Sequence, residues 1–568
     1  MLSRRQWIYK DVSMNEVKRV SEAAGISPFI AKVLLSRGIS DIDYIKQFLN
    51  SSAEDLHDPF LMKDMDKAVE RIVSAINANE KIIIYGDYDV DGVTSTSILY
   101  NFLVSQHAEV DYYIPDRIEE GYGLSISVLE KVLQKRCSLI ITVDCGITAI
   151  EEVDYVNKNG VDIIITDHHA CKDILPSAYA VVSPSRTDCT YPFQHLAGVG
   201  VVYKLLNALC LKLGLGDLYQ SYLEFVALGT VADVVPLTGE NRIIVKYGLE
   251  RIIDTGNIGL RTLVENCELK DRILSSWVIS FVIAPRINAA GRIGSAKRAV
   301  ELFTTANERQ SQIIVEQLNQ DNKFRQETEA QIMQQVVNNI ENSIDLDKEK
   351  VIVVAGEGWH HGVIGIVASK ITDRYYRPCI LLSLENGLAK GSGRSIEGFD
   401  LFKALSHCEQ HLERFGGHQM AAGLSVKGNN ISNLREAINL YADSMMSKQD
   451  MIPKLIIDVV LNKDDICIEN VKDIELLSPF GAGNQGPLFL YTGCKISEAR
   501  AVGDNKHLKL KLQNEGIYLD AIGFNMGDFN NQINRTQLFD VAGAMEINNW
   551  NSMQKIQLNL KDIKSSYG

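Results

Sequence analysis

The chain has 568 residues, which is too long for one hydrophobic core and favours roughly three or four domains. Its 46% hydrophobic and 23% charged residues are typical of a globular protein, and its longest apolar run, 274–285, is shorter than the ~20 residues of a membrane helix. A net charge of −14 argues against wrapping of long duplex DNA, although a local basic groove remains compatible with nucleic-acid binding.

The N-terminus and the cysteines both favour a cytoplasmic protein. The first twenty residues contain no apolar core of a secretory signal. The 10 cysteines occur singly, without a CxxC pair, which argues against a disulfide framework or a zinc ribbon and favours reduced thiols.

The chain begins with a polar, mainly helical region, expected over residues 1–65. A domain over 66–240 follows, in which short β-branched runs alternate with helical patterns. Such alternation predicts an α/β fold with buried parallel strands. The predicted strands are 81–87, 109–116, 137–146, 161–169 and 178–184.

Three further regions complete the chain. Residues 241–348 are expected to form a helical connector with a basic motif and a long exposed helix over 306–344, because no glycine or proline interrupts that stretch. Residues 349–448 show a second, smaller α/β pattern. Residues 449–568 contain five or six short strands without intervening helices, which suggests a small β-barrel.

Acidic and imidazole side chains follow three of the predicted parallel strands, where ligands bind in open α/β sheets. Asp87, Asp89 and Asp91 follow the first strand. Asp89 and Asp91 are expected on one side of an extended segment, with a helix beginning near Thr94. Asp144 and the pair His168 and His169 stand at the ends of two other predicted strands. Asp233, in an apolar surrounding, is a further candidate later in the chain.

This set of residues predicts a metal site. Like charges so close together destabilise a fold unless a positive group lies among them. Carboxylates with imidazole and no thiolate suit Mn²⁺ or Mg²⁺ better than zinc, and four or more carboxylates favour two ions. An EF-hand calcium loop is an alternative for 87–92, but the glutamate that such a loop requires is missing. Helix capping by itself would explain Asp144 or Asp233.

Several motifs resemble a known family. "GDYDVDG", "VDCG", "TDHH" and "GTVADVVPL" resemble the four motifs of the DHH phosphoesterase superfamily. "APRINAAGRIG", "GWHHGVIGIVASK", "GSGRS" and "RFGGHQMAAGL" resemble its RecJ branch. The resemblance covers nearly the whole chain. It implies a parallel-sheet DHH domain, a smaller DHHA1-type domain and an OB-like C-terminal β-barrel.

The resemblance also implies the activity. The expected enzyme is a metal-dependent exonuclease that degrades single-stranded DNA in the 5′→3′ direction to nucleoside 5′-monophosphates in DNA recombination and repair. It would be a monomer with two ions, usually Mn²⁺ with Mg²⁺ as the other choice. Asp144 would bridge the ions, and Asp89, Asp91, His168 and Asp233 match the other ligands. Related phosphatases carry a histidine where this chain has Tyr85, so a compensating role of Asp87 stays open.

Other residues are expected to act on the substrate. His169 is a candidate to assist protonation of the leaving 3′-oxygen. By resemblance, Arg286, Asn288 and Arg292 would face the scissile phosphate, whereas Ser392, Arg394 and His418 would recognise a terminal 5′-phosphate. The stretches 389–401 and 413–424 are expected to be glycine-rich loops whose amides could hold an oxyanion. For His360 and His361 a structural or phosphate-contact role is favoured over metal binding, because adjacent helical residues point apart.

The barrel is expected to offer a second surface for the strand. Phe480, Phe489 and Tyr491 are candidates for stacking on bases, with a place in the barrel core as the alternative. The acidic net charge favours recruitment through a single-strand-binding protein or a helicase, because bulk electrostatics will not draw this chain onto DNA.

Two other functions stay open at this point. One is a DHH phosphodiesterase that cleaves short oligoribonucleotides or cyclic dinucleotides, although such relatives are usually shorter and lack a terminal barrel. The other is an inactive scaffold that binds single strands. Scaffolds of this kind lose motif carboxylates, whereas this chain keeps all of them.

Overall fold

The computed structural model describes residues 5–117, 119–270, 272–550 and 553–566. The chain forms two compact units. The first comprises Met1–Ser51, Lys448–Phe480 and Gln485–Gly568, and the second comprises Ser52–Ser447 and Gly481–Asn484. Residues 1–4, which open the predicted N-terminal helical region, lie outside the described residues.

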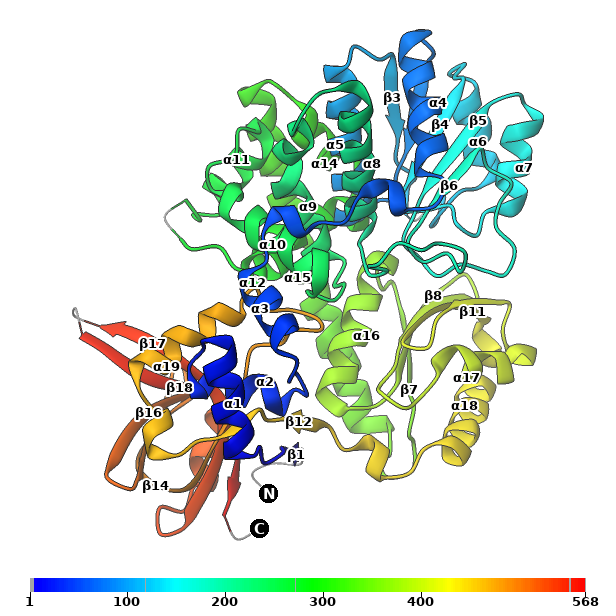
Figure 1. Cartoon of the computed structure of the whole chain (residues 1–568). Helices are drawn as coiled ribbons and strands as arrows, with labels where there is room; N and C mark the ends of the chain where they lie inside the picture. The colour runs from blue at the N-terminus through cyan, green and yellow to red at the C-terminus, as the bar shows by residue number, and fades with distance from the viewer. Residues whose placement is uncertain (1–4, 118, 271, 551–552, 567–568) are drawn as a thin grey trace. The chain divides into compact units, whose positions relative to one another are not determined.

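A five-stranded sheet lies at the centre of the DHH-like part of the second unit. Its order is β3-β2-β4-β5-β6, and all neighbouring strands are parallel (Figure 1). The predicted parallel α/β fold is therefore confirmed. The strands are β2 (Ile82–Tyr85), β3 (Val110–Tyr113), β4 (Leu139–Val143), β5 (Asp162–Thr166) and β6 (Ala180–Val182).

The two faces of this sheet pack against different helices, because side chains alternate along a strand. Ile82 and Ile84 join a core cluster with α4, α5 and α8, whereas Ile83 and Tyr85 join a cluster with α6 and α7. Burial on both faces explains why the strands read as continuous apolar runs. These helices are α4 (Met65–Asn77), α5 (Val90–Ser105), α6 (Ile126–Leu133), α7 (Ile150–Lys158) and α8 (Gly198–Leu213).

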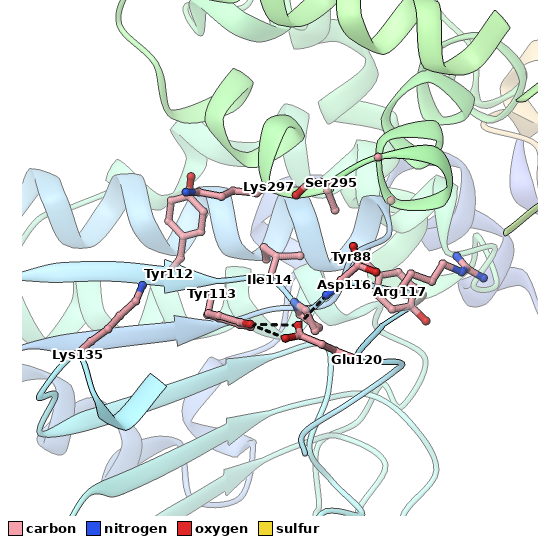
Figure 2. A pocket seen from close by; sticks show the side chains of 14 residues that line it. Tyr88, Tyr112, Tyr113, Ile114, Asp116, Arg117, Glu120, Lys135, Ser295 and Lys297 are labelled. Carbon is pink, nitrogen blue, oxygen red and sulfur yellow. Dashed lines mark hydrogen bonds between the residues drawn. The ribbon is translucent and has the colours of Figure 1, made fainter. Parts of the chain in front are cut away.

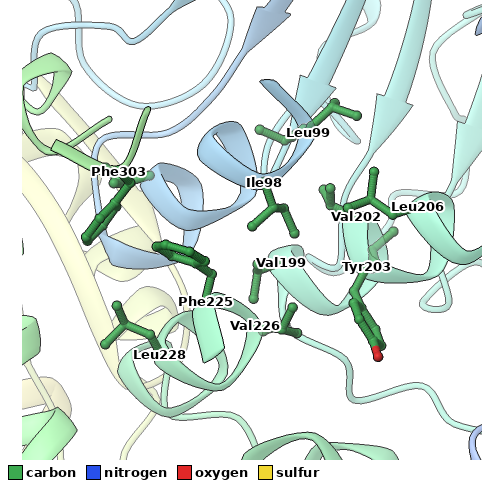
Figure 3. Close-up of a cluster of buried hydrophobic side chains, with 14 of the residues drawn as sticks. Ile98, Leu99, Val199, Val202, Tyr203, Leu206, Phe225, Val226, Leu228 and Phe303 are labelled. Carbon is green, nitrogen blue, oxygen red and sulfur yellow. The ribbon is translucent and has the colours of Figure 1, made fainter. Parts of the chain in front are cut away.

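A helical segment extends the larger core cluster (Figure 3). A π-helical turn, Ile279–Ile283, joins two of its helices, and its last helix has 36 residues, which confirms the predicted long helix. No described helix combines the length and the hydropathy needed to cross a membrane. The helices are α9 (Leu223–Ala232), α10 (Gly239–Ile252), α11 (Ile258–Asn266), α12 (Ser276–Val278), α13 (Ala284–Ile293), α14 (Lys297–Thr304) and α15 (Glu308–Ser343).

The DHHA1-like part of the second unit has a mixed sheet in the order β10-β11-β9-β8-β7. Strands β7 and β8 run parallel, and the other neighbouring pairs are antiparallel. Residues 388–394 and 414–427 are largely strands rather than loops, so the prediction of two glycine-rich loops was wrong there. The elements are β7 (Ile352–Glu357), α16 (His361–Tyr375), β8 (Cys379–Glu385), β9 (Leu388–Arg394), α17 (Leu401–His407), β10 (Arg414–Gly417), β11 (Ala421–Lys427) and α18 (Ile431–Met445).

The first unit combines the N-terminal helices with the C-terminal barrel in one core. Phe29 of α2 stacks on Phe489 of β14 with ring centroids 5.3 Å apart. Phe489 and Tyr491 are 0% and 4% exposed, so of the two roles considered for them, stacking on bases and a place in the barrel core, the structure supports the core. The helices are α1 (Met14–Ala24), α2 (Pro28–Ser36), α3 (Ile42–Asn50) and α19 (Ile468–Asp473).

The barrel closes through five strands, because β14 pairs with both β15 and β17, while β16 and β18 complete the ring. Short pairs lie outside the ring: β13 runs parallel to β14, and β1 runs parallel to β12. The strands are β1 (Gln6–Ile8), β12 (Lys454–Ile456), β13 (Val459–Val460), β14 (Phe489–Val502), β15 (His507–Asn514), β16 (Ile517–Gly523), β17 (Leu538–Trp550) and β18 (Met553–Ser565).

We expect Phe303→Ala to destabilise the second unit by about 3–5 kcal/mol, because it removes a large, fully buried side chain from the core. Phe303 packs edge-on against Phe225, with ring centroids 5.1 Å apart. Urea unfolding followed by circular dichroism measures the effect. Tyr518→Ala, at a position that is 63% exposed, is the control and should leave the curve nearly unchanged. Equal curves for Phe303→Ala and the parent would contradict the packing.

Candidate metal centre and phosphate-binding residues

The acidic and imidazole side chains gather at one edge of the parallel sheet. Strands β2, β4 and β5 end at Tyr85, Val143 and Thr166, and the predicted ligands follow within a few residues. Because these strands are parallel neighbours, their carboxyl ends share one edge. Asp233, at the C-terminus of α9, joins them from a different part of the chain.

The donor atoms form three groups, within each of which all donor atoms lie at most 4.8 Å apart. Asp144 and His168 each belong to two groups, so they link the cluster together. All six predicted ligands, together with His169, are thus brought to one place. The groups are Asp87, Asp89 and Asp144; Asp91, His168 and Asp233; and Asp144, His168 and His169.

The segment with the first three aspartates is not extended throughout, and this corrects two expectations. Helix α5 begins at Val90 rather than near Thr94, so Asp89 is its N-cap and Asp91 lies in its first turn. The Asp89 carboxylate accepts hydrogen bonds from the amides of Asp91 and Gly92, at 2.9 and 3.1 Å. Asp89 and Asp91 therefore reach the cluster through a helix start and not through one face of a strand.

Backbone amides hold the Asp91 carboxylate, and a glycine leaves room for that of Asp144. The Asp91 carboxylate accepts hydrogen bonds from the amides of Gly198 and Val199, at 2.6 and 2.7 Å, at the start of α8. Asp144 adopts a left-handed backbone with φ of 61°, which is uncommon outside glycine and occurs often at functional sites. A Cβ atom on Gly198 would lie 2.6 Å from Asp144 Oδ1, so glycine leaves the room that this carboxylate occupies.

Asp167 orients the two histidines and was missed in the sequence analysis. It is buried, and its Oδ1 atom accepts hydrogen bonds from the backbone amides of His168 and His169. The same oxygen lies 2.7 Å from His169 Nδ1, so that Nε2 is the ring nitrogen that can contact other groups. Its position directly before His168 and His169 in the "TDHH" motif could have indicated this role. Tyr122, also missed, places its hydroxyl 3.3 Å from His169 Nε2.

Burial and mutual repulsion raise the pKa of several carboxyl groups in the cluster. Burial, then the charge of Asp89, raises the pKa of Asp87 well above its usual value and that of Asp91 to about 7. Burial, followed by the charge of Asp91, raises the pKa of Asp144 strongly and that of Asp233 to about 9. The charge of His169 lowers the pKa of Asp87, Asp91 and Asp233 but offsets only part of this effect.

The two histidines are shifted in opposite directions. Burial, together with the neighbouring charge of His169, lowers the pKa of His168 to about 4, so the ring is neutral and able to act as a ligand. Burial also disfavours charge on His169, but the hydrogen bond and charge of Asp167 outweigh it and raise the pKa to about 9. His169 therefore carries a proton at neutral pH.

The orphaned polar atoms of the cluster show that divalent metal ions fit it. Asp87 Oδ1, Asp144 Oδ1 and His168 Nε2 are buried and have no hydrogen-bond partner within the part of the chain that the structure describes. Asp144 Oδ1 and His168 Nε2 lie 3.1 Å apart, but the neutral imidazole supplies no positive charge to the carboxylate. Buried polar atoms without partners are costly and rare. Carboxylate oxygens and a neutral imidazole are ligands that Mn²⁺ and Mg²⁺ accept. Asp87 and Asp144 thus each have an oxygen available for an ion, and His168 has its Nε2 nitrogen available.

Arginines from separate elements converge near the cluster. Arg292 is half-buried on α13, and burial lowers its pKa to about 10. The nearby positive charges of Arg117, Arg325 and Arg394 add to this effect, whereas Asp89 opposes it. Arg117, which no predicted motif contained, also lies 4.8 Å from the ring centroid of Tyr88. Arg325 is paired with Glu329 at 2.7 Å, and Arg117, Arg292 and Arg394 supply guanidinium groups suited to an anionic substrate.

The other predicted substrate residues are placed differently. Arg286 donates from Nε to Asn319 Oδ1 of α15 at 2.8 Å, so its side chain is held between two helices. Asn288 lies half-buried two residues further along α13. Arg394 Nη1 donates to Ser392 Oγ at 3.0 Å on β9. His418 is exposed in the turn between β10 and β11, where Ala421 pairs with Arg394.

The start of α16 meets these arginines. Arg292 Nη1 donates to the carbonyl oxygen of Gly362 at 3.1 Å, and a Cβ atom on Gly362 would clash with the carbonyl oxygen of Arg292 at 2.5 Å. A Cβ on Gly365 would come within 3.0 and 3.2 Å of Ser392 Oγ and Arg394 Nη2. His360 caps the helix by accepting from the Gly362 amide, which gives this histidine a structural role.

A cavity of about 290 Å³ is lined by Tyr88, which lies between Asp87 and Asp89 in the sequence, and by Arg117. Figure 2 shows Tyr88 and Arg117 at one end of the lining side chains and Tyr112 and Lys297 at the other. Glu120 accepts a hydrogen bond from the Tyr113 hydroxyl at 2.9 Å within it. Aromatic and cationic side chains together suit the stacking and charge of a nucleotide.

The fold and the site define the class of the protein. Residues 81–230 match the family model described as the DHH family, N-terminal domain, and residues 348–444 match the DHHA1 domain. Residues 457–562 match the RecJ OB domain. The class is thus that of DHH phosphoesterases, with the additional domain of one branch.

Relatives place the chain more narrowly. It is 41% identical to "Single-stranded-DNA-specific exonuclease RecJ" of Bacillus subtilis (strain 168), over 100% of this chain and 72% of that protein. The structure of RecJ from Thermus thermophilus in complex with Mn²⁺ matches with a TM-score of 0.85 at 30% identity, over 98% of this chain and 79% of that one. Its Mg²⁺ complex matches with a TM-score of 0.79 at 28% identity, covering 98% and 78%. The chain belongs to the RecJ family.

We expect the metal-free protein to lose stability as the pH rises from 7 to 9. Asp233, with its pKa near 9, keeps a proton in the folded state across this window, whereas the unfolded chain has already lost it. A folded state that binds more protons is destabilised by rising pH, by roughly 1 kcal/mol per pH unit for one such proton.

Calorimetric unfolding in EDTA at pH 7, 8 and 9 measures this dependence. Asp233→Asn is the control and should give a flatter profile, because it cannot titrate. Saturating Mn²⁺ should remove the loss, since an ion binds the ionised carboxylate. A melting temperature that rises between pH 7 and 9 without metal would contradict the shifted pKa.

Proposed function

We propose that this chain is a metal-dependent exonuclease that degrades single-stranded DNA in the 5′→3′ direction to nucleoside 5′-monophosphates. The observation that carries the proposal is the buried cluster around Asp144, with its unpartnered oxygens, beside a group of arginines. Such an arrangement is suited to a phosphodiester. Its negative charge would be attracted to the arginines, and its non-bridging oxygens could bind the metal ions. Its place would be the cytoplasm, in DNA recombination and repair.

The cluster residues would hold two divalent ions. The proposed ligands are Asp87, Asp89, Asp91, Asp144, His168 and Asp233. Asp144 and His168 each belong to two of the groups of donor atoms described above. Mn²⁺ or Mg²⁺ bound there supplies Lewis-acid activation of a water molecule and neutralises charge on the phosphate. Asp167 and the amides at the start of α8 keep the ligand side chains in orientation before any ion binds.

His169 is the proposed general acid. Its Nδ1 atom is held by Asp167, so its second proton sits on Nε2, and a pKa near 9 keeps the ring protonated at neutral pH. A protonated Nε2 directed at the leaving 3′-oxygen could donate this proton as the bond to phosphorus breaks. The Tyr122 hydroxyl near Nε2 would limit rotation of the ring.

Arginines and the start of α16 would bind the terminal nucleotide. Arg394 and Ser392 are the proposed ligands of the 5′-phosphate, because they lie against the start of α16, where an anion is favoured. His418 would complete this terminal-phosphate side. Arg292, which also contacts the start of α16, and Asn288 are proposed to face the scissile phosphate. Arg286 is proposed to act through its position on α13, since Asn319 holds its guanidinium.

The protein is proposed to act as a monomer that a single-strand-binding protein or a helicase recruits. The net charge of −14 supports this idea, because long-range attraction to DNA would be weak. Cleavage of short oligoribonucleotides or cyclic dinucleotides is the competing activity. The RecJ OB domain supports a longer strand as substrate.

We expect metal-stripped protein, supplied with Mn²⁺ or Mg²⁺, to release mononucleotides from 5′-phosphorylated single-stranded DNA but not from its duplex. Asp144→Ala should lower the rate by roughly 10³-fold, because loss of ion-mediated charge stabilisation costs several kcal/mol. Chromatography of the products, with matching RNA in parallel, measures both results. Products from very short RNA or cyclic dinucleotides alone would favour the competing activity, and strand binding without cleavage would favour an inactive scaffold.

We expect Arg394→Ala to raise the KM for 5′-phosphorylated single strands by roughly 10–100-fold, the value of one charge-assisted hydrogen-bonding partner. The KM for 5′-hydroxyl strands should change little, because those strands lack the group that Arg394 is proposed to bind. Arg414→Ala, on an exposed residue of β10, is the matched control. An equal loss on both strands would refute recognition of the terminal phosphate.

A further inference from the structure

The "GAGN" turn, Gly481–Asn484, is a short piece of chain that packs away from its sequence neighbours. Phe480 and Gln485, on either side of it, belong to the first unit, whereas the turn itself belongs to the second. Gly481 and Asn484 exchange two backbone hydrogen bonds, of 2.9 and 3.2 Å, which close the turn on itself. Nothing in the proposed chemistry uses this segment.

The turn contacts the loop that follows the metal-binding residue Asp233. The amide of Leu237 donates to the carbonyl oxygen of Ala482 at 2.7 Å. Leu237 is buried in the core of the second unit, and Asn484 is 5% exposed. The contact is therefore a backbone hydrogen bond from a buried donor residue to the half-buried Ala482, about 245 residues away in sequence.

Glycine leaves room for this contact at two places. A Cβ atom on Gly481 would lie 2.6 Å from Leu237 Cδ1, and one on Gly483 would lie 2.9 Å from Pro236 Cβ. Gly483 also has φ of +69°, in the left-handed region that glycine adopts without strain. A side chain at either position would displace Leu237 or Pro236, so the two glycines favour the close approach of the turn.

The loop itself needs external support. Val234 directly follows Asp233 and has φ of 64°, although β-branched residues are strained in this region. Its side chain is 68% exposed, so its own packing does little to stabilise this backbone. Asn241 donates to the carbonyl oxygen of Pro236 at 3.0 Å, and the turn provides the hydrogen bond at Leu237. A strained backbone persists only where its surroundings over-determine it.

We propose that the GAGN turn is a positioning element for Asp233, and thereby for metal binding at the group Asp91, His168 and Asp233. The turn fixes residues 236–237 and so limits the conformations open to the strained backbone at residue 234. Asp233 Oδ2 then stays 3.7 Å from His168 Nε2 before an ion arrives. The inference rests on the proposed metal site, and it gives a segment near the barrel a role in the DHH domain.

Hydrogen exchange in the full-length, metal-free protein tests the positioning directly. Gly481→Ala should speed exchange in a peptide that covers 233–238, because the added methyl group pushes Leu237 away from Ala482. Gly486→Ala is the matched control, since a Cβ there meets its nearest neighbour only at 3.9 Å, and it should leave the exchange unchanged. Unchanged exchange in Gly481→Ala would overturn the proposal, whatever the activity of the enzyme.

Mn²⁺ titration by calorimetry tests the consequence for the ion. Gly483→Ala should weaken Mn²⁺ binding about tenfold, as loss of a supporting contact around a metal ligand typically does. Gly516→Ala carries the same left-handed backbone cost, with φ of +80°, but meets no atom within 4 Å, and should bind like the parent. Parent-like Mn²⁺ affinity in Gly483→Ala, or an effect on the KM for single strands alone, would overturn the proposal.

A compensating pair keeps the test valid if a single variant folds poorly. Leu237→Ala removes the atoms that the Gly481→Ala methyl would meet at 2.6 and 3.0 Å. In this background Gly481→Ala should cause no further loss of Mn²⁺ affinity, whereas it causes a loss in the parent. Equal losses in both backgrounds would show that no contact with Leu237 is involved and would overturn the proposal. Mn²⁺ binding and exchange report on the turn even if the proposed exonuclease activity is absent.

Discussion

Repulsion among buried carboxylates at the edge of the parallel sheet is the constraint on which the rest of the structure depends. Burial and neighbouring charge raise the pKa of Asp87, Asp91, Asp144 and Asp233. Without cations, such a cluster favours protonation or expansion of the fold. The backbone amides at the starts of α5 and α8 offset part of this cost, and bound divalent ions would offset the remainder.

Repulsion between like charges also occurs among the arginines that are proposed to bind the substrate. The arginines near Arg292 are Arg325 on α15, Arg394 on β9 and Arg117 after β3, and their positive charges lower the pKa of Arg292. A phosphodiester between the two clusters would lower the energy of both, since it brings oxygens to the metal ions and negative charge to the guanidinium groups. The site thus combines a group of carboxylates with a group of arginines, and a bound phosphodiester with its metal ions would reduce the repulsion within each group.

Local backbone strain marks the same region. Asp144 and Val234 both adopt left-handed backbones, one at a proposed bridging ligand and one directly after a ligand. Strain of this kind needs support from neighbouring segments. The support comes from distant parts of the chain: Thr166 accepts from the Asp144 amide, and the GAGN turn accepts from the Leu237 amide. The metal centre is held by backbone contacts as much as by its ligands.

The sequence by itself determined the parallel sheet, the long helix, the closed barrel and the members of the metal cluster, because β-branched runs and strand-end acids are local signals. Only the tertiary structure decided that Asp89 caps a helix, that Asp167 orients His169, and that Arg117 joins Arg292. It likewise decided that Phe489 belongs to a core shared with the N-terminal helices. These features depend on contacts between segments far apart in the chain. The periodicity or spacing of residues within one segment does not show which distant segment will pack against that segment.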